Sequence, residues 1–160
     1  MNALAKPDKP LDEVPGDKPV EQPKSVLFIC NHNVIRSTMA EALTRARYGK
    51  RIYVASAGVT AGTPDPFVEA VLLEIGIEWA NHEPQELKYL DDGYFDLIIT
   101  LSPQAHHVAL ERAHVEAMEV DYWPAADPTV VTGSREQRLD AYRDVRDRIA
   151  ARIKERFGAP

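Results

Sequence analysis

Apolar and polar positions alternate between two periods from Ser25 to the end of the chain. The continuous apolar run at 26–29 is typical of a strand buried on both faces of a parallel sheet. Further short apolar runs predict strands at 52–55, 95–100 and 118–122. Apolar residues at helical spacing predict helices at 37–48, 65–75, 103–112 and 134–157. Strands that alternate with helices predict an α/β fold, a doubly wound four-stranded parallel sheet flanked by helices.

The first 24 residues have a different composition from the rest. Five of the 12 prolines lie there, interleaved with Lys, Asp and Glu and with almost no large apolar side chains. Such a segment cannot bury enough apolar surface to offset the entropy lost on ordering. We therefore expect residues 1–24 to form a disordered tail, with a short docking arm as the alternative, and residues 25–160 to form one folded domain.

Composition and charge exclude several classes of protein. The chain has 160 residues, a net charge of −6 and one cysteine. A single cysteine excludes an internal disulfide framework and a Cys-based zinc cluster, and it fits a reducing cytoplasm. The negative balance argues against a nucleic-acid partner. No apolar run approaches the roughly 20 residues of a membrane span, and the N-terminus lacks a secretory apolar segment. We expect a cytoplasmic protein with no membrane partner.

The cysteine opens the loop between the first strand and the first helix. In sheets of this kind, ligands bind beyond the carboxyl ends of the strands. Backbone N–H groups that wrap toward a helix N-terminus attract anions, and the field of the helix favours thiolate over thiol at Cys30. Arg36 can fold back over the same cavity, where its planar guanidinium suits a tetrahedral oxyanion. A buried, inert cysteine is the alternative, but the strand before it and the helix after it favour an oxyanion site.

The residues around this loop resemble a known family. Cys-x5-Arg-Ser follows a Val-Leu-Phe-Ile strand and precedes Met-Ala-Glu-Ala-Leu. This pattern is similar to that of the low-molecular-weight protein tyrosine phosphatases, whose superfamily includes the arsenate reductases built on the same fold. Ser56-Ala57-Gly58 and Asp127-Pro128 extend the resemblance, which covers about residues 25–157.

The resemblance implies roles for individual residues. Cys30 would attack phosphorus and form a cysteinyl-phosphate, and Asp127 would first protonate the leaving oxygen and then activate water. Ser37 would donate a hydrogen bond to the sulfur, and Asn33 would hold the loop together with Ser56 and His82. The phosphate would be bound by the loop that contains Asn31, His32, Asn33, Val34, Ile35, Arg36 and Ser37. Without this loop, an Asp that precedes Pro typically only starts a turn.

Several positions depart from the family pattern. His32 stands where the family usually has Gly, so it must tolerate that backbone conformation or project toward the mouth of the site. Ile35 replaces a second cysteine found in many members, which should make Cys30 easier to over-oxidise. The loop at 59–63 is short and lacks an aromatic wall. Ser102 and Ala109 stand where thioredoxin-coupled reductases have cysteines, so this chain cannot form their internal disulfide.

We therefore expect a phosphomonoester hydrolase, a protein tyrosine phosphatase that needs no cofactor and no metal. Its partners would be a phosphorylated protein or small phosphomonoester, and oxyanions such as phosphate or arsenate. One alternative is an arsenate reductase that uses an external low-molecular-weight thiol. Another is an oxyanion-binding regulator without turnover. His106, His107, His114 and Glu111 are predicted to be solvated side chains of a surface helix rather than metal ligands.

Overall fold

A computed structural model describes residues 22–90, 93–116 and 118–160. The tail predicted at residues 1–24 therefore lies almost entirely outside the described residues. Its last residue is held by the domain: the Lys24 N–H donates to Asp96 Oδ2 at 2.7 Å, and the Lys24 carbonyl accepts from the Tyr53 N–H at 2.9 Å. Among the described residues, no helix is both long enough and apolar enough to cross a membrane.

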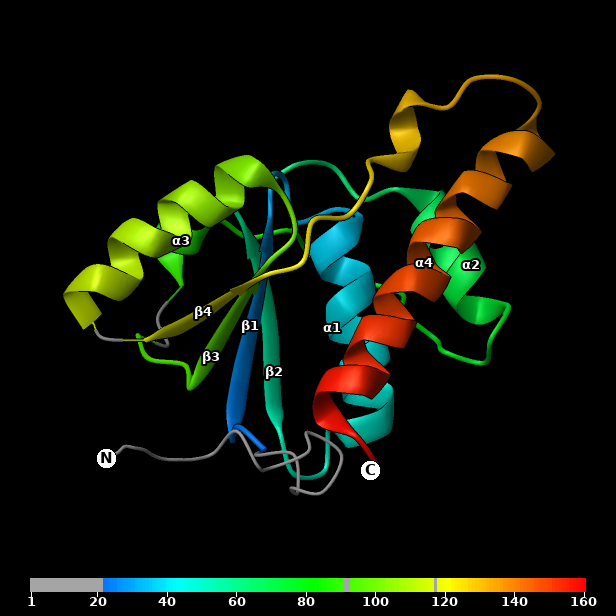
Figure 1. The fold of residues 1–160 in the computed structure, drawn as a ribbon. Helices are drawn as coiled ribbons and strands as arrows, with labels where there is room; N and C mark the ends of the chain where they lie inside the picture. Colours follow the sequence, from blue (N-terminus) through cyan, green and yellow to red (C-terminus); the bar gives the residue numbers. More distant parts are fainter. Residues whose placement is uncertain (1–21, 91–92, 117) are drawn as a thin grey trace, which may run out of the picture.

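Four parallel strands form one sheet in the order β2-β1-β3-β4 (Figure 1). The strands are β1 (Ser25–Cys30), β2 (Tyr53–Gly58), β3 (Leu97–Thr100) and β4 (Glu119–Tyr122). β1 is paired on both edges and buried on both faces, which explains its uninterrupted apolar sequence. The predicted four-stranded parallel α/β fold is confirmed.

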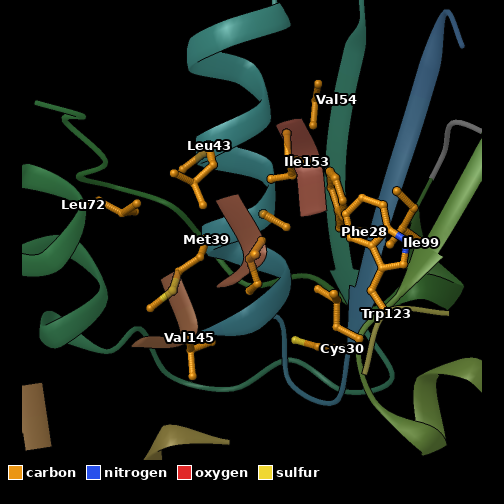
Figure 2. Packing of buried hydrophobic residues seen from close by; sticks show 14 of the residues in the cluster. Phe28, Cys30, Met39, Leu43, Val54, Leu72, Ile99, Trp123, Val145 and Ile153 are labelled. Atoms are coloured by element: carbon orange, nitrogen blue, oxygen red, sulfur yellow. The ribbon is translucent and has the colours of Figure 1, made fainter. Parts of the chain in front are cut away.

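Helices cover both faces of the sheet. They are α1 (Arg36–Tyr48), α2 (Pro66–Leu73), α3 (Pro103–Glu116) and α4 (Arg135–Phe157), with short 3₁₀ segments η2 (Leu87–Tyr89) and η3 (Pro128–Val130). α3 lies on one face; α1 and α4 lie on the other, with α2 beside α4 (Figure 1). Figure 2 shows the larger core cluster on the α1 and α4 side, with Cys30 at its edge where β1 ends. The sheet thus delivers Cys30 to the start of α1.

Two element boundaries differ from the prediction in ways that shape the site. β2 extends through Ser56 to Gly58, although small residues have low strand propensity. Parallel pairing with β1, which places Cys30 opposite Gly58, overrides that propensity. The second helix begins at Pro66 rather than at Asp65, because the Asp65 side chain accepts from the Phe67 N–H and caps the helix.

Candidate active site

A cavity of about 440 Å³ opens at the carboxyl edge of the sheet. Its lining brings together Cys30 and Arg36 with Asp127, which lies about 90 residues further along the chain. His32, Val34 and Ile35 also line it. The other predicted loop and support residues do not: these are Asn31, Asn33, Ser37, Ser56 and His82. The opposite wall and rim come from Gly62, Thr63, Pro64, Asp65, Pro66 and Thr129.

The segment after β2 runs beside the Cys30 loop and takes up its carbonyl groups. The carbonyl oxygens of Cys30, Asn31 and His32 accept from the N–H groups of Val59, Thr60 and Gly62 at 3.0, 2.9 and 2.9 Å. These donors neutralise the negative ends of the loop's peptide dipoles. At its other end the loop enters α1, whose N-cap residue Ile35 provides no side-chain cap and whose first turn has no acidic residue. The local field therefore favours an anion.

Asn33 holds the loop in place through side-chain hydrogen bonds. It is fully buried and adopts φ = 56°, a left-handed conformation that Asn tolerates better than most residues. Its Nδ2 donates to Ser37 Oγ at 2.9 Å and to Ser56 Oγ at 2.8 Å. Its Oδ1 accepts from the backbone N–H of Gln85 at 3.0 Å. The structure thus brings Asn33, Ser37 and Ser56 together at one node.

His82 contacts the loop less directly. Its Nε2 lies 3.3 Å from Thr38 Oγ1, and Thr38 in turn donates to the Asn33 carbonyl at 3.0 Å. Gln85 takes the position closer to the node, because its side chain also donates to the Ser56 carbonyl at 2.8 Å. Nothing in the sequence pattern singled out Gln85, whose contacts depend on how residues 82–86 return beside the loop.

The sulfur of Cys30 is buried next to the hydroxyl group of Ser37. The thiol is free and only 2% exposed, and its Sγ lies 3.0 Å from Ser37 Oγ. Ser37 Oγ already accepts a hydrogen bond from Asn33, so its own hydrogen can point to the sulfur. A hydrogen bond donated to sulfur favours thiolate, the form that acts as a nucleophile.

Arg36 and Asp127 are connected through the segment that follows β4. The Trp123 and Ala125 N–H groups donate to the carbonyls of Thr100 and Leu101 at 2.8 and 3.1 Å, so the segment continues along the end of β3. Arg36 Nη1 donates to the Ala125 carbonyl at 3.0 Å. This contact holds the guanidinium beside the cavity, two residues before Asp127.

Asp127 caps the short η3 segment and is held as a carboxylate. Its Oδ1 accepts from the Thr129 N–H at 3.0 Å and from the Thr129 hydroxyl at 2.7 Å. Partial burial alone would raise the pKa of Asp127, but both hydrogen bonds and the charges of Arg36 and His32 outweigh it and lower the pKa below its usual value.

The departures from the family pattern have specific places in the structure. His32 does not take a positive φ; that conformation falls on Asn33 instead. The His32 ring lies exposed at the rim, with Nδ1 2.9 Å from Thr60 Oγ1. The described residues that line the cavity include no Phe, Tyr or Trp. Ser102 is buried, and its hydroxyl donates to Asn31 Oδ1 at 2.6 Å.

The histidine-rich helix also differs in part from its prediction. His107 is exposed as expected, but His106 is half-buried. The His106 Nδ1 lies 2.9 Å from Thr100 Oγ1, and the ring stacks on Tyr122 with centroids 4.5 Å apart. His106 is therefore a packing residue between α3 and the sheet rather than a solvated one.

The parallel sheet and the cysteine-containing loop define an α/β protein with a cavity at the carboxyl end of β1, next to the N-terminus of α1. The chain belongs to the low molecular weight phosphotyrosine protein phosphatase family, whose model matches residues 25–158.

Proteins that are similar to this chain carry the names of different activities. An arsenate reductase of Shouchella clausii is 31% identical over 134 residues, which cover 82% of this chain and 94% of that protein. A solved arsenate reductase in a phosphate-binding state is similar with a TM-score of 0.70 at 25% identity, over 82% of this chain and 95% of the other. An arginine phosphatase from Geobacillus stearothermophilus has a TM-score of 0.66 at 27% identity, over 82% and 89%.

Proposed function

We propose that the protein is a phosphomonoester hydrolase that acts through a cysteinyl-phosphate, with phosphotyrosine in proteins as its substrate. The observation that carries the proposal is the position of Asp127, which lines the same cavity as Cys30 and Arg36. A nucleophile, an anion clamp and a proton donor then surround one space. Because the nucleophile must be a reduced thiol, we also propose that the protein works in the cytoplasm.

In the first step the Cys30 thiolate attacks phosphorus, and the bond between phosphorus and the ester oxygen breaks. Arg36 and the loop N–H groups bind the equatorial oxygens, whose charge must be stabilised in the transition state. Asp127 gives its proton to the leaving oxygen. In the second step water attacks the cysteinyl-phosphate, Asp127 takes the proton of that water, and inorganic phosphate and the thiolate are released.

The walls of the cavity can accommodate a substrate with an aromatic ring, although they are aliphatic rather than aromatic. Val34, Ile35, Pro64 and Pro66 line it and can pack against the faces of a phenyl ring. Its volume of about 440 Å³ is within the usual range for sites that hold small molecules.

Hydrolysis of p-nitrophenyl phosphate under reducing conditions tests the proposal. We expect turnover in the parent chain, complete loss in Cys30→Ser and a loss of about 10²–10⁴-fold in kcat in Asp127→Ala, the range typical of a missing general acid. No turnover in the parent would refute the phosphatase. Full activity in Asp127→Ala would remove only the role of Asp127.

A second candidate is arsenate reduction with an external thiol, because curated relatives of about 30% identity carry that name. Cys30 would form a bond to arsenic as one arsenate oxygen leaves as water. One external thiol would then attack the sulfur, the bond between sulfur and arsenic would break with its electron pair going to arsenic, and a mixed disulfide and arsenite would result. A second external thiol would then release Cys30, so that two thiols become one disulfide while As(V) becomes As(III). Arsenate-dependent consumption of glutathione or mycothiol without phosphatase activity would favour this reaction.

Two further measurements distinguish the remaining candidates. Phosphate binding by calorimetry without either turnover would indicate an oxyanion-binding regulator. The second measurement compares hydrolysis of a phosphotyrosine peptide with that of a phosphoarginine peptide, because one solved neighbour is an arginine phosphatase and two carboxylates, Asp65 and Asp127, line this cavity. Faster hydrolysis of the phosphoarginine peptide would indicate that phosphoarginine, rather than phosphotyrosine, is the substrate.

A further inference from the structure

A chain of hydrogen bonds leads from Cys30 away from the cavity and ends on a buried acid. Ser37 Oγ, 3.0 Å from Cys30 Sγ, accepts from Asn33 Nδ2, and the same Nδ2 donates to Ser56 Oγ. Ser56 Oγ then donates to Glu41 Oε1 at 2.5 Å. Glu41 is 6% exposed, and the three residues between it and Cys30 are at most 1% exposed.

The chemistry of these groups fixes the direction of every bond. A carboxylate only accepts, so the Ser56 hydroxyl must donate to Glu41 and can only accept from Asn33. The Asn33 amide cannot turn over, because its Oδ1 accepts from the Gln85 N–H. Its Nδ2 therefore donates to Ser37, and the Ser37 hydrogen is left for the sulfur of Cys30.

Arg45 holds the Glu41 carboxylate in this orientation. One helical turn after Glu41, its guanidinium pairs with Glu41 Oε2 and also donates to the Val54 carbonyl at 2.7 Å. The guanidinium carbon lies 5.4 Å from the ring centre of Trp79. With Oε2 occupied by Arg45, Oε1 faces Ser56, and the negative charge stays in place.

We propose that Glu41 is a positioning residue for the nucleophile: its carboxylate takes the Ser56 hydrogen, so that Ser56 accepts from Asn33. With the Asn33 amide oriented by Gln85, its other hydrogen goes to Ser37, which donates to the Cys30 thiolate. The inference rests on the part of the proposed function in which Cys30 acts as a thiolate, a part that the phosphatase and the reductase share. An amide at position 41 would keep its oxygen on Arg45 and turn its NH₂ toward Ser56. Ser56 would then receive donors from both amides, and its own hydrogen would have lost its acceptor. This weakens the bond from Asn33 to Ser56 and, through Asn33 and Ser37, the bond to sulfur.

The rate of Cys30 alkylation by iodoacetamide as a function of pH tests this without any substrate. In full-length Glu41→Gln, we expect the half-maximal pH of alkylation to rise by about one unit, with alkylation about tenfold slower below it, the effect of weakening one hydrogen bond to a charged group. The charged groups that share the cavity, His32, Arg36, Asp65 and Asp127, are unchanged in this variant. Glu155→Gln, on the exposed face of α4, is the matched control and should leave the profile unchanged.

A double variant separates this role from a general structural one. Ser37→Ala alone should raise the half-maximal pH, and adding Glu41→Gln to Ser37→Ala should raise it no further, because the effect passes through Ser37. An unchanged profile in Glu41→Gln, or an equal further shift in the double variant, would overturn the proposal. If circular dichroism shows that Glu41→Gln does not fold, Ser56→Ala replaces it with the same expectations, since it breaks the chain at its middle.

Discussion

Asp127 must carry a proton when the proposed reaction begins, yet its surroundings favour the carboxylate. The hydroxyl and N–H of Thr129 and the charges of Arg36 and His32 lower its pKa, against the opposing effect of burial. A phosphate dianion bound beside Arg36 would offset that cationic charge and raise the pKa of Asp127, so that Asp127 could keep the proton that it donates. The balance at this residue should therefore determine the high-pH limit of activity.

Thr129→Val tests that balance because it removes the hydroxyl bond to Asp127 and keeps the backbone bond and the side-chain shape. The loss of a bond to the charged form raises the pKa of Asp127. Protonated Asp127 then persists to higher pH in the complex with substrate, so we expect the decline of kcat at high pH to move upward by about half to one unit. The same profile for Thr132→Val, an exposed neighbour in the same loop, should match the parent. A downward shift, or none, would contradict the assignment.

At the scale of elements, the Cys30 loop and the end of β2 are fitted against each other at Gly58. A Cβ on Gly58 would lie 2.3 Å from the Thr60 carbonyl oxygen and 2.6 Å from the Asn33 backbone nitrogen. Both are backbone atoms that cannot turn aside as a flexible side chain could. This close approach explains why Ser-Ala-Gly closes the strand that pairs with Cys30.

We therefore expect Gly58→Ala to lower the free energy of unfolding by about 2 kcal/mol or more, in the upper range of overpacking effects, and to distort the loop enough to reduce turnover. Gly93→Ala is the matched control, since a Cβ there would meet nothing within 4 Å. Urea unfolding and p-nitrophenyl phosphate hydrolysis measure the two effects. Equal stability of the two variants would show that the loop can move away from β2.

Elements and local motifs could be predicted from the sequence, and the family resemblance implied that Asn33, Ser37 and Ser56 support the loop. The other contacts behind the loop could not be predicted. The apolar run of β1 and the helical spacing of α4 follow from burial, and Cys30 and Arg36 lie where a strand enters a helix. Glu41 looks like an ordinary helix residue, because nothing in a linear pattern shows that its helix face meets Ser56 on β2. Gln85 and the placement of His82 beside Thr38 likewise depend on a returning segment without regular structure. A sequence pattern predicts local elements, but it does not show which distant segments come into contact.

At the scale of the whole molecule, the longest helix is tied to the wall of the cavity. Tyr142 on α4 donates its hydroxyl to Asp65 Oδ2 at 2.6 Å, while Asp65 Oδ1 caps α2. Asp65 also lines the cavity, so one carboxylate joins two helices and the site. Burial of the phenol, and then its bond to Asp65, raise the pKa of Tyr142 above its ordinary value of 10.0.

This pKa shift links global stability to alkaline pH. The folded state keeps Tyr142 protonated, whereas the unfolded state loses that proton above about pH 10, so unfolding becomes easier as the pH rises. Tyr142→Phe should be less stable than the parent by about 1.5–3 kcal/mol at pH 7, because it loses a hydrogen bond to a charged acceptor. The difference between the two proteins should shrink above pH 10 by up to about 1.4 kcal/mol per pH unit, since Phe has no proton to lose. Urea unfolding of both proteins between pH 7 and pH 11 measures this, and all other titrating groups are common to both. A constant difference across that range would mean that the Tyr142 hydroxyl does not hold its proton in the folded state, and that α4 is joined to the cavity wall by packing alone.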